Sequence, residues 1–150
     1  MKVVAVSPQD EKLLRSAERV HRQLRPHLGD YVARMKVVLG AGAEMAVALD
    51  AAGEVAGVTV FRVLEKTHSG RDLYCDDLVT DEAKRSTGVG RALLAYMQEL
   101  ARGRGCDNFS LDSGVQRQQA HKFYFREGMT VTSFHFDKKL SDRASGVKVQ

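Results

Sequence analysis

The stretch KRSTGVGRALLAYM, residues 84–97, places Gly88 and Gly90 directly ahead of a long apolar run with helical spacing. Glycine loses more conformational freedom on folding than any other residue, so Gly-Val-Gly is a poor way to begin a helix. A helix N-terminus nevertheless offers unpaired backbone N–H groups and partial positive charge, which together bind phosphate. Arg85 and Arg91 add positive side chains. The stretch indicates either a phosphate-binding loop or a tight turn in which glycine only relieves strain.

Two well-known nucleotide loops do not fit this turn. A dinucleotide-binding fingerprint requires a third glycine three positions after Gly90, where this sequence has Leu93. A Walker P-loop requires Gly-Lys-Ser/Thr, and no such tripeptide follows. Any phosphate bound at this turn therefore belongs to another kind of ligand.

The segments around the turn predict a mixed α/β domain. Strands are expected at 2–6, 44–49, 54–66, 71–80, 108–113 and 131–140, and helices at 8–25, 30–39, 88–102 and 118–128. Ser7 is the expected N-cap of the first helix, with Pro8 in its first turn. The antiparallel front half of the sheet should become parallel where helix 88–102 crosses over, because parallel strands need such a connection.

Length and composition indicate one soluble domain over residues 1–150. The chain is 43% hydrophobic and 28% charged, and no apolar run approaches the roughly 18–20 residues of a membrane-spanning helix. The N-terminus meets charge and proline too early for a signal peptide. The two cysteines, Cys75 and Cys106, form no CxxC motif, so neither a disulfide framework nor a metal site is expected. A reducing cytoplasm is the expected location.

A net charge of +4 raises the question of a nucleic-acid partner. The basic residues are spread along the chain and interrupted by acidic pairs, and no basic run is interleaved with aromatic residues. We therefore expect no nucleic-acid partner, and interpret the charge as a surface property that favours the approach of an anionic small ligand.

Two motifs at matching spacing identify a family. Arg85-x-x-Gly88-x-Gly90, following DDLVTDEAK, resembles the [Arg/Gln]-x-x-Gly-x-[Gly/Ala] loop of the GNAT family of N-acetyltransferases. AHKFYFREGM, residues 120–129, is similar to a second helix of that family. The resemblance covers about residues 71–137. It implies a mostly antiparallel sheet with a splayed parallel strand pair, flanked by about four helices, and acetyl-CoA as co-substrate.

The resemblance also implies a set of cofactor contacts. Backbone groups of Leu78, Val79 and Thr80 would hold the pantetheine arm, and the N–H of Val79 would steady the thioester carbonyl. The pyrophosphate would lie on the loop formed by Arg85, Ser86, Thr87, Gly88, Val89 and Gly90, which continues into Arg91. This sequence departs from the family at two positions. Arg117 stands where many members have an asparagine that contacts the cofactor, and Ser86 stands where many have glycine.

Acyl transfer to an amine requires a base, because an aliphatic amine is mostly protonated at pH 7. Strand alternation predicts that the carboxylates of Asp76 and Asp77 point to opposite faces, and so have different roles. By similarity to diamine-type acetyltransferases, Asp76 would be the base and Asp77 would bind the cationic substrate. The alternative is a solvated strand edge that carries two charges. Cys75 has no identifiable catalytic partner, and is interpreted as a small buried residue.

Tyr124 is the candidate general acid, because a phenol can share its proton as charge develops on the leaving sulfur. The alternative is packing in the core, since Tyr124 is the middle of an aromatic triplet, residues 123–125. Tyr31 and Met35 lie in the region that closes over the acceptor in this family, although core packing explains them equally well.

The leading hypothesis is an acetyl-CoA-dependent N-acetyltransferase that acts on the primary amine of a small cationic molecule by direct attack. A protein or peptide acceptor is one alternative, and a non-catalytic acyl-CoA-binding sensor is the other. Family members often form dimers, so a homodimer is possible, with segment 131–137 and the polar tail 141–150 as candidate interface segments.

Overall fold

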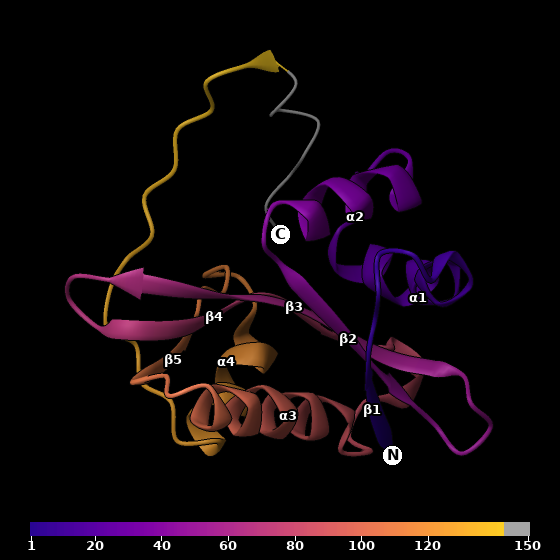
Figure 1. Cartoon of the computed structure of the whole chain (residues 1–150). Helices are drawn as coiled ribbons and strands as arrows, with labels where there is room; N and C mark the ends of the chain where they lie inside the picture. The colour runs from indigo at the N-terminus through magenta and orange to yellow at the C-terminus, as the bar shows by residue number, and fades with distance from the viewer. Residues whose placement is uncertain (143–150) are drawn as a thin grey trace.

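A computed structural model describes residues 1–142 of the chain. Its centre is a five-stranded sheet in the order β1-β2-β3-β4-β5 (Figure 1). The strands are β1 (Lys2–Ala5), β2 (Glu44–Leu49), β3 (Val55–Lys66), β4 (Gly70–Thr80) and β5 (Asn108–Leu111). Neighbouring strands are antiparallel except β4 and β5, which are parallel. The mixed sheet predicted from the sequence is confirmed.

Helices cover both faces of this sheet. They are α1 (Glu11–Leu24), α2 (Tyr31–Gly40), α3 (Val89–Gly103) and α4 (Gln118–Arg126), with a 3-10 turn at Glu82–Lys84. The first two helices pack on one face, where Leu14, Val20 and Met35 join the core. On the other face, Leu94 and Met97 of α3 pack against Phe61 of β3. Within residues 1–142 no helix is long and apolar enough to cross a membrane.

The first helix begins three residues later than the sequence predicted. Its N-cap is Asp10, whose carboxylate accepts a hydrogen bond from the N–H of Leu13 at 3.1 Å. Ser7 instead accepts the N–H of Asp10 through its backbone carbonyl, at 3.0 Å, and so closes a turn that contains Pro8. The predicted cap at Ser7 was wrong because a carboxylate three positions downstream satisfies the free N–H groups of the helix.

The last predicted strand, residues 131–140, is absent. Residues 130–140 form an extended arm with no regular structure, and every residue of the arm is exposed. In Figure 1 the arm runs past the ends of β4 and β5 and away from the sheet. Alternation shows that a segment is able to pair as a strand, but pairing also needs a neighbouring strand edge that the segment reaches. Within the described residues, β5 is therefore an edge strand.

Strands β4 and β5 pair over only four residues. Asp72 to Cys75 lie opposite Asn108 to Leu111, and the register ends there. The remainder of β4 continues to Thr80 while β5 has already stopped at Leu111. The backbone of residues 76–80 therefore faces away from β3 without a neighbouring strand, and this gap becomes one wall of the site.

Gly57 sets how closely α3 approaches the sheet. It lies opposite Thr80 in the β3–β4 register. A Cβ atom at this position would come within 2.5 Å of Val89 Cγ1 and 2.9 Å of Leu93 Cδ1. Real Cβ contacts are not that short, so only glycine permits the first turn of α3 to lie directly on the strand. The position of the glycine turn before α3 thus depends on a glycine far away in sequence.

Candidate active site

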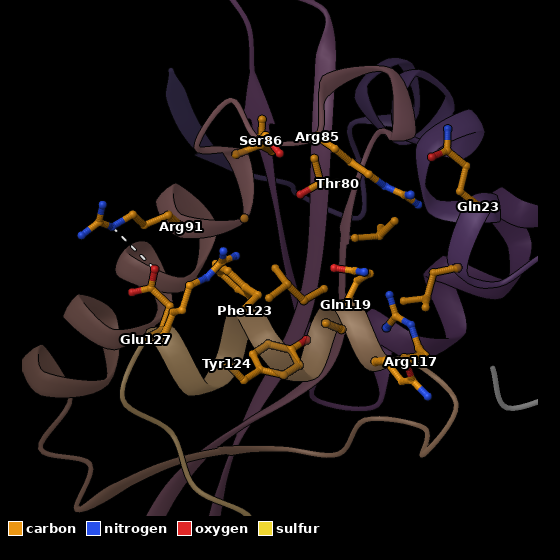
Figure 2. A pocket seen from close by; sticks show the side chains of 18 of the residues that line it. Gln23, Thr80, Arg85, Ser86, Arg91, Arg117, Gln119, Phe123, Tyr124 and Glu127 are labelled. Atoms are coloured by element: carbon orange, nitrogen blue, oxygen red, sulfur yellow. Dashed lines mark ion pairs between the residues drawn. The ribbon is translucent and has the colours of Figure 1, made fainter.

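A cleft of about 1090 Å³ lies between the end of β4, the N-terminus of α3 and the helix α4. Figure 2 shows side chains from all three elements turned into it, with Gln23 of α1 at one end. The predicted cofactor residues that line it are Leu78, Val79, Thr80, Arg85, Ser86, Gly88, Val89, Gly90, Arg91 and Arg117. Tyr124 lines it too. Segments separated by about forty residues in sequence therefore meet in one cavity.

The glycine turn has a backbone that few other residues adopt. Gly88 is the N-cap of α3 with φ 88°, in the left-handed region that favours glycine. Ser86 also has a positive φ, of 64°. That conformation gives a physical reason for the glycine that the family pattern often has at this position. Thr87 was predicted to contact the cofactor but does not line the cleft, and its hydroxyl donates a hydrogen bond to the carbonyl of Lys84.

The two glycines of the turn have different functions. A Cβ atom at Gly88 would meet no protein atom within 4 Å, so this glycine is required by its backbone conformation. A Cβ at Gly90 would lie 3.4 Å from Phe123 Cζ and from Thr80 Oγ1. Gly90 therefore stands where α3, α4 and β4 come together. The first hydrogen bond of the helix runs from the N–H of Ala92 to the carbonyl of Gly88. The backbone N–H groups that precede Ala92 in the first turn therefore remain available to a ligand.

The charged residues that line the cleft are mostly positive. Its arginines are Arg85, Arg91, Arg117 and Arg126, whereas its one acidic lining residue is Glu127. Glu127 lies 3.6 Å from Arg91, whose side chain is 79% exposed (Figure 2). Arginine side chains in the same cleft as the free N–H groups of α3 form an environment suited to phosphate.

Tyr124 projects from α4 into the cleft, and its hydroxyl points toward the middle of the cavity (Figure 2). Burial raises the pKa of Tyr124 to about 12, with a further increase from nearby Cys75 and a decrease from Arg117. The phenol is therefore protonated throughout the physiological range. A proton held in this way is available to a leaving group that gains negative charge.

Asp76 and Asp77 lie on β4 just before the residues that line the cleft, and they are not part of its lining. A β-bulge occurs here, because Val60 pairs with Asp77 and the next residue, Phe61, pairs with Cys75. Asp76 is the extra residue of this bulge. Its carboxylate accepts a hydrogen bond from Arg62 at 2.8 Å, and Asp77 contacts α1.

The bulge turns both carboxylates toward the face of the sheet that carries α1. Val60 packs into the α1 core and Phe61 into the α3 core, so Arg62 returns to the α1 face and holds Asp76 there. The prediction that strand alternation separates the two side chains was wrong, because a bulge adds one residue and interrupts the alternation.

The two carboxylates differ in their surroundings. Burial raises the pKa of Asp76 above its ordinary value, although the hydrogen bond and charge of Arg62 oppose this. Burial also acts to raise the pKa of Asp77, but hydrogen bonds and charges from His21 and Arg25 outweigh it and hold that pKa below its ordinary value. Asp76 therefore has the greater affinity for a proton, as a general base requires.

Sequence reasoning missed three residues of this region: His21, Arg25 and Arg62. His21 Nε2 lies 2.7 Å from Asp77 Oδ2, and Arg25 Nη2 lies 2.6 Å from Asp77 Oδ1. On its other side, His21 Nδ1 lies 2.7 Å from the hydroxyl of Tyr31. The signal for His21 was present, because it occupies the buried stripe of α1 at helical spacing from Ala17. No local pattern in the sequence indicated that His21 would contact Asp77 and Tyr31, which lie on other elements.

Tyr31 and Met35 are each only 2% exposed and belong to the core under α1 and α2. Cys75 is buried as well, and burial raises the pKa of its thiol to about 12. The thiol is protonated at neutral pH and is a poor nucleophile.

A glycine turn at a helix N-terminus, an unpaired stretch of β4 and a half-buried tyrosine thus line one cleft. The chain matches the model of the acetyltransferase (GNAT) family over residues 11–129. It belongs to this family.

Two relatives with curated names are similar over part of the chain. An uncharacterized N-acetyltransferase of Bacillus subtilis, YhdJ, is 44% identical over 74 residues, which are 49% of this chain and 52% of that protein. The aminoalkylphosphonate N-acetyltransferase of Salmonella typhimurium is 33% identical over 89 residues, 59% of this chain and 58% of that protein. The matched regions thus span little more than half the length of these relatives.

The fold is shared with solved structures of low sequence identity. A ribosomal-protein-alanine N-acetyltransferase from Brucella melitensis biovar Abortus superposes with a TM-score of 0.79 at 15% identity. The superposition covers 93% of this chain and 100% of that chain. At this identity the likeness concerns the fold.

Proposed function

We propose that this protein transfers the acetyl group of acetyl-CoA to the primary amine of a small molecule by direct attack. The observation that carries the proposal is one cleft lined by the glycine turn, the unpaired end of β4 and Tyr124. The glycine turn, where the phosphate would bind, and the candidate acid therefore face the same cavity.

The cofactor would bind along this cleft. Its pyrophosphate would lie at the glycine turn, where Arg85 and Arg91 add charge to the helical N–H groups. Its pantetheine arm would follow the backbone of Leu78, Val79 and Thr80, which β5 leaves unpaired. Arg117, at the start of α4, lines the opposite wall and would take the place of the family's asparagine.

In the reaction, the amine nitrogen forms a bond to the thioester carbonyl carbon, and the bond from that carbon to sulfur breaks. The amine proton passes to Asp76, directly or through a water molecule. Tyr124 donates its proton to the departing thiolate. The buried, protonated thiol of Cys75 argues against an acyl-enzyme intermediate, since nucleophilic attack requires a thiolate.

The charge around Asp76 bears on the class of acceptor. Asp76 is paired with Arg62, and Asp77 with Arg25, so each acid already has a cationic partner. Arg62 and Arg25 remain 31% and 22% exposed. We propose that the acceptor is a small amine that also carries an anionic group, with the amine at Asp76 and the anion near these arginines. The similarity to an aminoalkylphosphonate N-acetyltransferase supports this class.

Asp77 was predicted to bind the cationic group of the substrate, and that stays a prediction. Its carboxylate already accepts hydrogen bonds from Arg25 and His21, so an acceptor amine would have to share it. We propose that Asp77 acts on the acceptor by orienting Arg25.

The test is thiol release from acetyl-CoA with a panel of acceptors at equal concentration. The panel holds an aminoalkylphosphonate, the matched alkylamine without the phosphonate, a polyamine and a peptide with a free N-terminus. We expect the aminoalkylphosphonate to give the highest kcat/KM. Highest turnover with the peptide would replace the small-molecule assignment, and tight acetyl-CoA binding without turnover of any acceptor would favour a sensor.

A further inference from the structure

The short segment between β4 and the glycine turn is held by side chains of α1. Its first residue, Asp81, directly follows the end of β4 and is only 2% exposed. The carboxylate of Asp81 accepts a hydrogen bond from Arg19 Nη2 at 2.7 Å and another from Gln23 Nε2 at 3.2 Å. Gln23 also accepts, through Oε1, the backbone N–H of Glu82 at 2.9 Å. One amide side chain of α1 therefore binds two successive residues of the segment.

The carboxylate of Asp81 also fixes the backbone of the segment. It accepts the N–H of Ala83 at 3.2 Å and so caps the 3-10 turn Glu82–Lys84. The backbone N–H of Asp81 donates to the carbonyl of Ala56 at 2.8 Å, which ties the segment to β3. The hydrogen bond from Arg19 is the main cause that lowers the pKa of Asp81 to about 2, so this acceptor is ionised at neutral pH. A buried carboxylate is stable only when donors surround it, and these donors join α1 to the turn.

The groups that would bind phosphate follow this segment directly. Arg85 is the next residue after the 3-10 turn, and it lines the cleft together with Gln23. In Figure 2 the side chain of Arg85 extends toward the side of the cleft where Gln23 lies. Gly88, the N-cap of α3, comes three residues later. A change in the path of residues 81–84 would therefore displace Arg85 and the backbone N–H groups of the glycine turn together.

We propose that Asp81 and Gln23 are positioning residues for the pyrophosphate of the cofactor. This inference rests on the proposed function, in which the pyrophosphate lies at the glycine turn. The two side chains act through the segment that they hold, which keeps Arg85 and the N–H groups of the turn in place before the cofactor arrives. A site that is already ordered loses less conformational entropy on binding, and its affinity is higher for that reason.

The test compares the binding of acetyl-CoA with that of S-acetylpantetheine, which has the same thioester and arm but no pyrophosphate. Asp81→Ala and Gln23→Leu should each raise Kd for acetyl-CoA about tenfold. Both should leave Kd for S-acetylpantetheine unchanged, because this donor does not reach the turn. Equal losses with the two donors, or no loss with either, would overturn the proposal. If the wild-type protein bound both donors equally well, the pyrophosphate site of the proposed function would itself be overturned, and this inference with it.

Further variants separate positioning from a general loss of stability. Glu18→Gln changes a charge on the same helix, at a carboxylate that pairs with Arg22, and should leave Kd for both donors unchanged. The double variant Gln23→Leu with Asp81→Ala should lose no more affinity than the weaker-binding single variant, because both changes break the same hydrogen bond. A loss equal to the full sum would overturn the joint role. Thermal melts check the fold of each variant, and Gln23→Leu, at a half-buried side chain, decides the test if Asp81→Ala does not fold.

Discussion

The imidazole of His21 lies 2.7 Å from the carboxylate of Asp77 and is itself only 1% exposed. Its other nitrogen contacts the hydroxyl of Tyr31, also at 2.7 Å. A chain of three side chains thus runs from the core under α2 to the bulge of β4. This chain, together with Arg25, fixes Asp77 beside the proposed base, and its members come from three separate elements.

Asp77→Asn should destabilise the fold. The substitution leaves Arg25 and His21 without their anionic partner, and breaking a buried pair in this way costs about 3 kcal/mol. The pKa of Asp77 is lowered in the fold, so its contribution is complete above its unfolded pKa and is lost as the pH falls through the folded pKa. Urea denaturation at pH 7 and at decreasing pH should show the two proteins converging in acid. Glu65→Gln, at an exposed ion pair, is the control and should leave the midpoint unchanged. If the difference in unfolding free energy between wild type and Asp77→Asn stayed constant across pH, the lowered pKa of Asp77 would be contradicted.

Arg62→Gln should move the acid limb of the pH–rate profile to higher pH. Arg62 lowers the pKa of Asp76, against the increase caused by burial, so its removal raises the pKa further. Since the base must be deprotonated to accept the amine proton, activity then appears only at higher pH. The profile of kcat/KM between pH 5 and 9 measures the shift. Arg102→Gln, which removes a surface arginine of α3, should leave the limb in place. An unmoved limb in Arg62→Gln would exclude Asp76 as the titrating base.

Tyr124→Phe should lower kcat by on the order of 10²-fold, the lower end of the range for general acid–base catalysis, because a thiolate is a tolerable leaving group. The affinity for acetyl-CoA should change little, since the ring remains. Steady-state assays measure kcat, and titration with acetyl-CoA measures the affinity separately. Phe125→Leu alters the neighbouring, 57% exposed aromatic residue and should keep the wild-type rate. Equal losses of rate and affinity would assign Tyr124 to binding instead of proton transfer.

Gly88→Ala should weaken cofactor binding without any steric clash within the protein. The φ of 88° costs an alanine roughly 1–2 kcal/mol, although its Cβ would meet no protein atom within 4 Å. Relaxation of the turn would move the N–H groups, and we expect Kd for acetyl-CoA to rise about tenfold, the equivalent of 1.4 kcal/mol. Gly103→Ala at the other end of α3 has open space and no positive φ, and should leave Kd unchanged. Isothermal titration gives both values, and unaltered binding in Gly88→Ala would place the pyrophosphate elsewhere.

Gly57→Ala should destabilise the protein by about 1–3 kcal/mol through overpacking against Val89 and Leu93. It should also raise Kd for acetyl-CoA, because α3 must move off the sheet and takes the glycine turn with it. The second substitution Val89→Ala removes the methyl group that would lie 2.5 Å from the new Cβ atom. The double variant should therefore recover part of the lost stability and part of the lost affinity for acetyl-CoA. Chemical denaturation and titration follow the two effects. A double variant as impaired as the single one would show that Val89 does not transmit the strain.

Much of the fold was predictable from local patterns. The β2 strand has the predicted bounds, 44–49, and the helices α2, α3 and α4 lie within two residues of their expected ends. Strand alternation and helical periodicity report which side of an element is buried, and this is a local property. The strand predicted at 131–140 was wrong, because alternation shows only that a segment can pair and not that a neighbouring strand edge is within reach.

The sequence by itself determined the family, the glycine turn and the set of polar residues offered to a cofactor, because these depend on residue type and spacing along the chain. Only the tertiary structure decided that Asp76 and Asp77 share one face, since a bulge depends on how β4 aligns with β3. It also decided that Asp77 is paired with His21 and Arg25, more than fifty residues away. Packing joins distant segments, and a side chain's proton affinity depends on the neighbours that packing gives it.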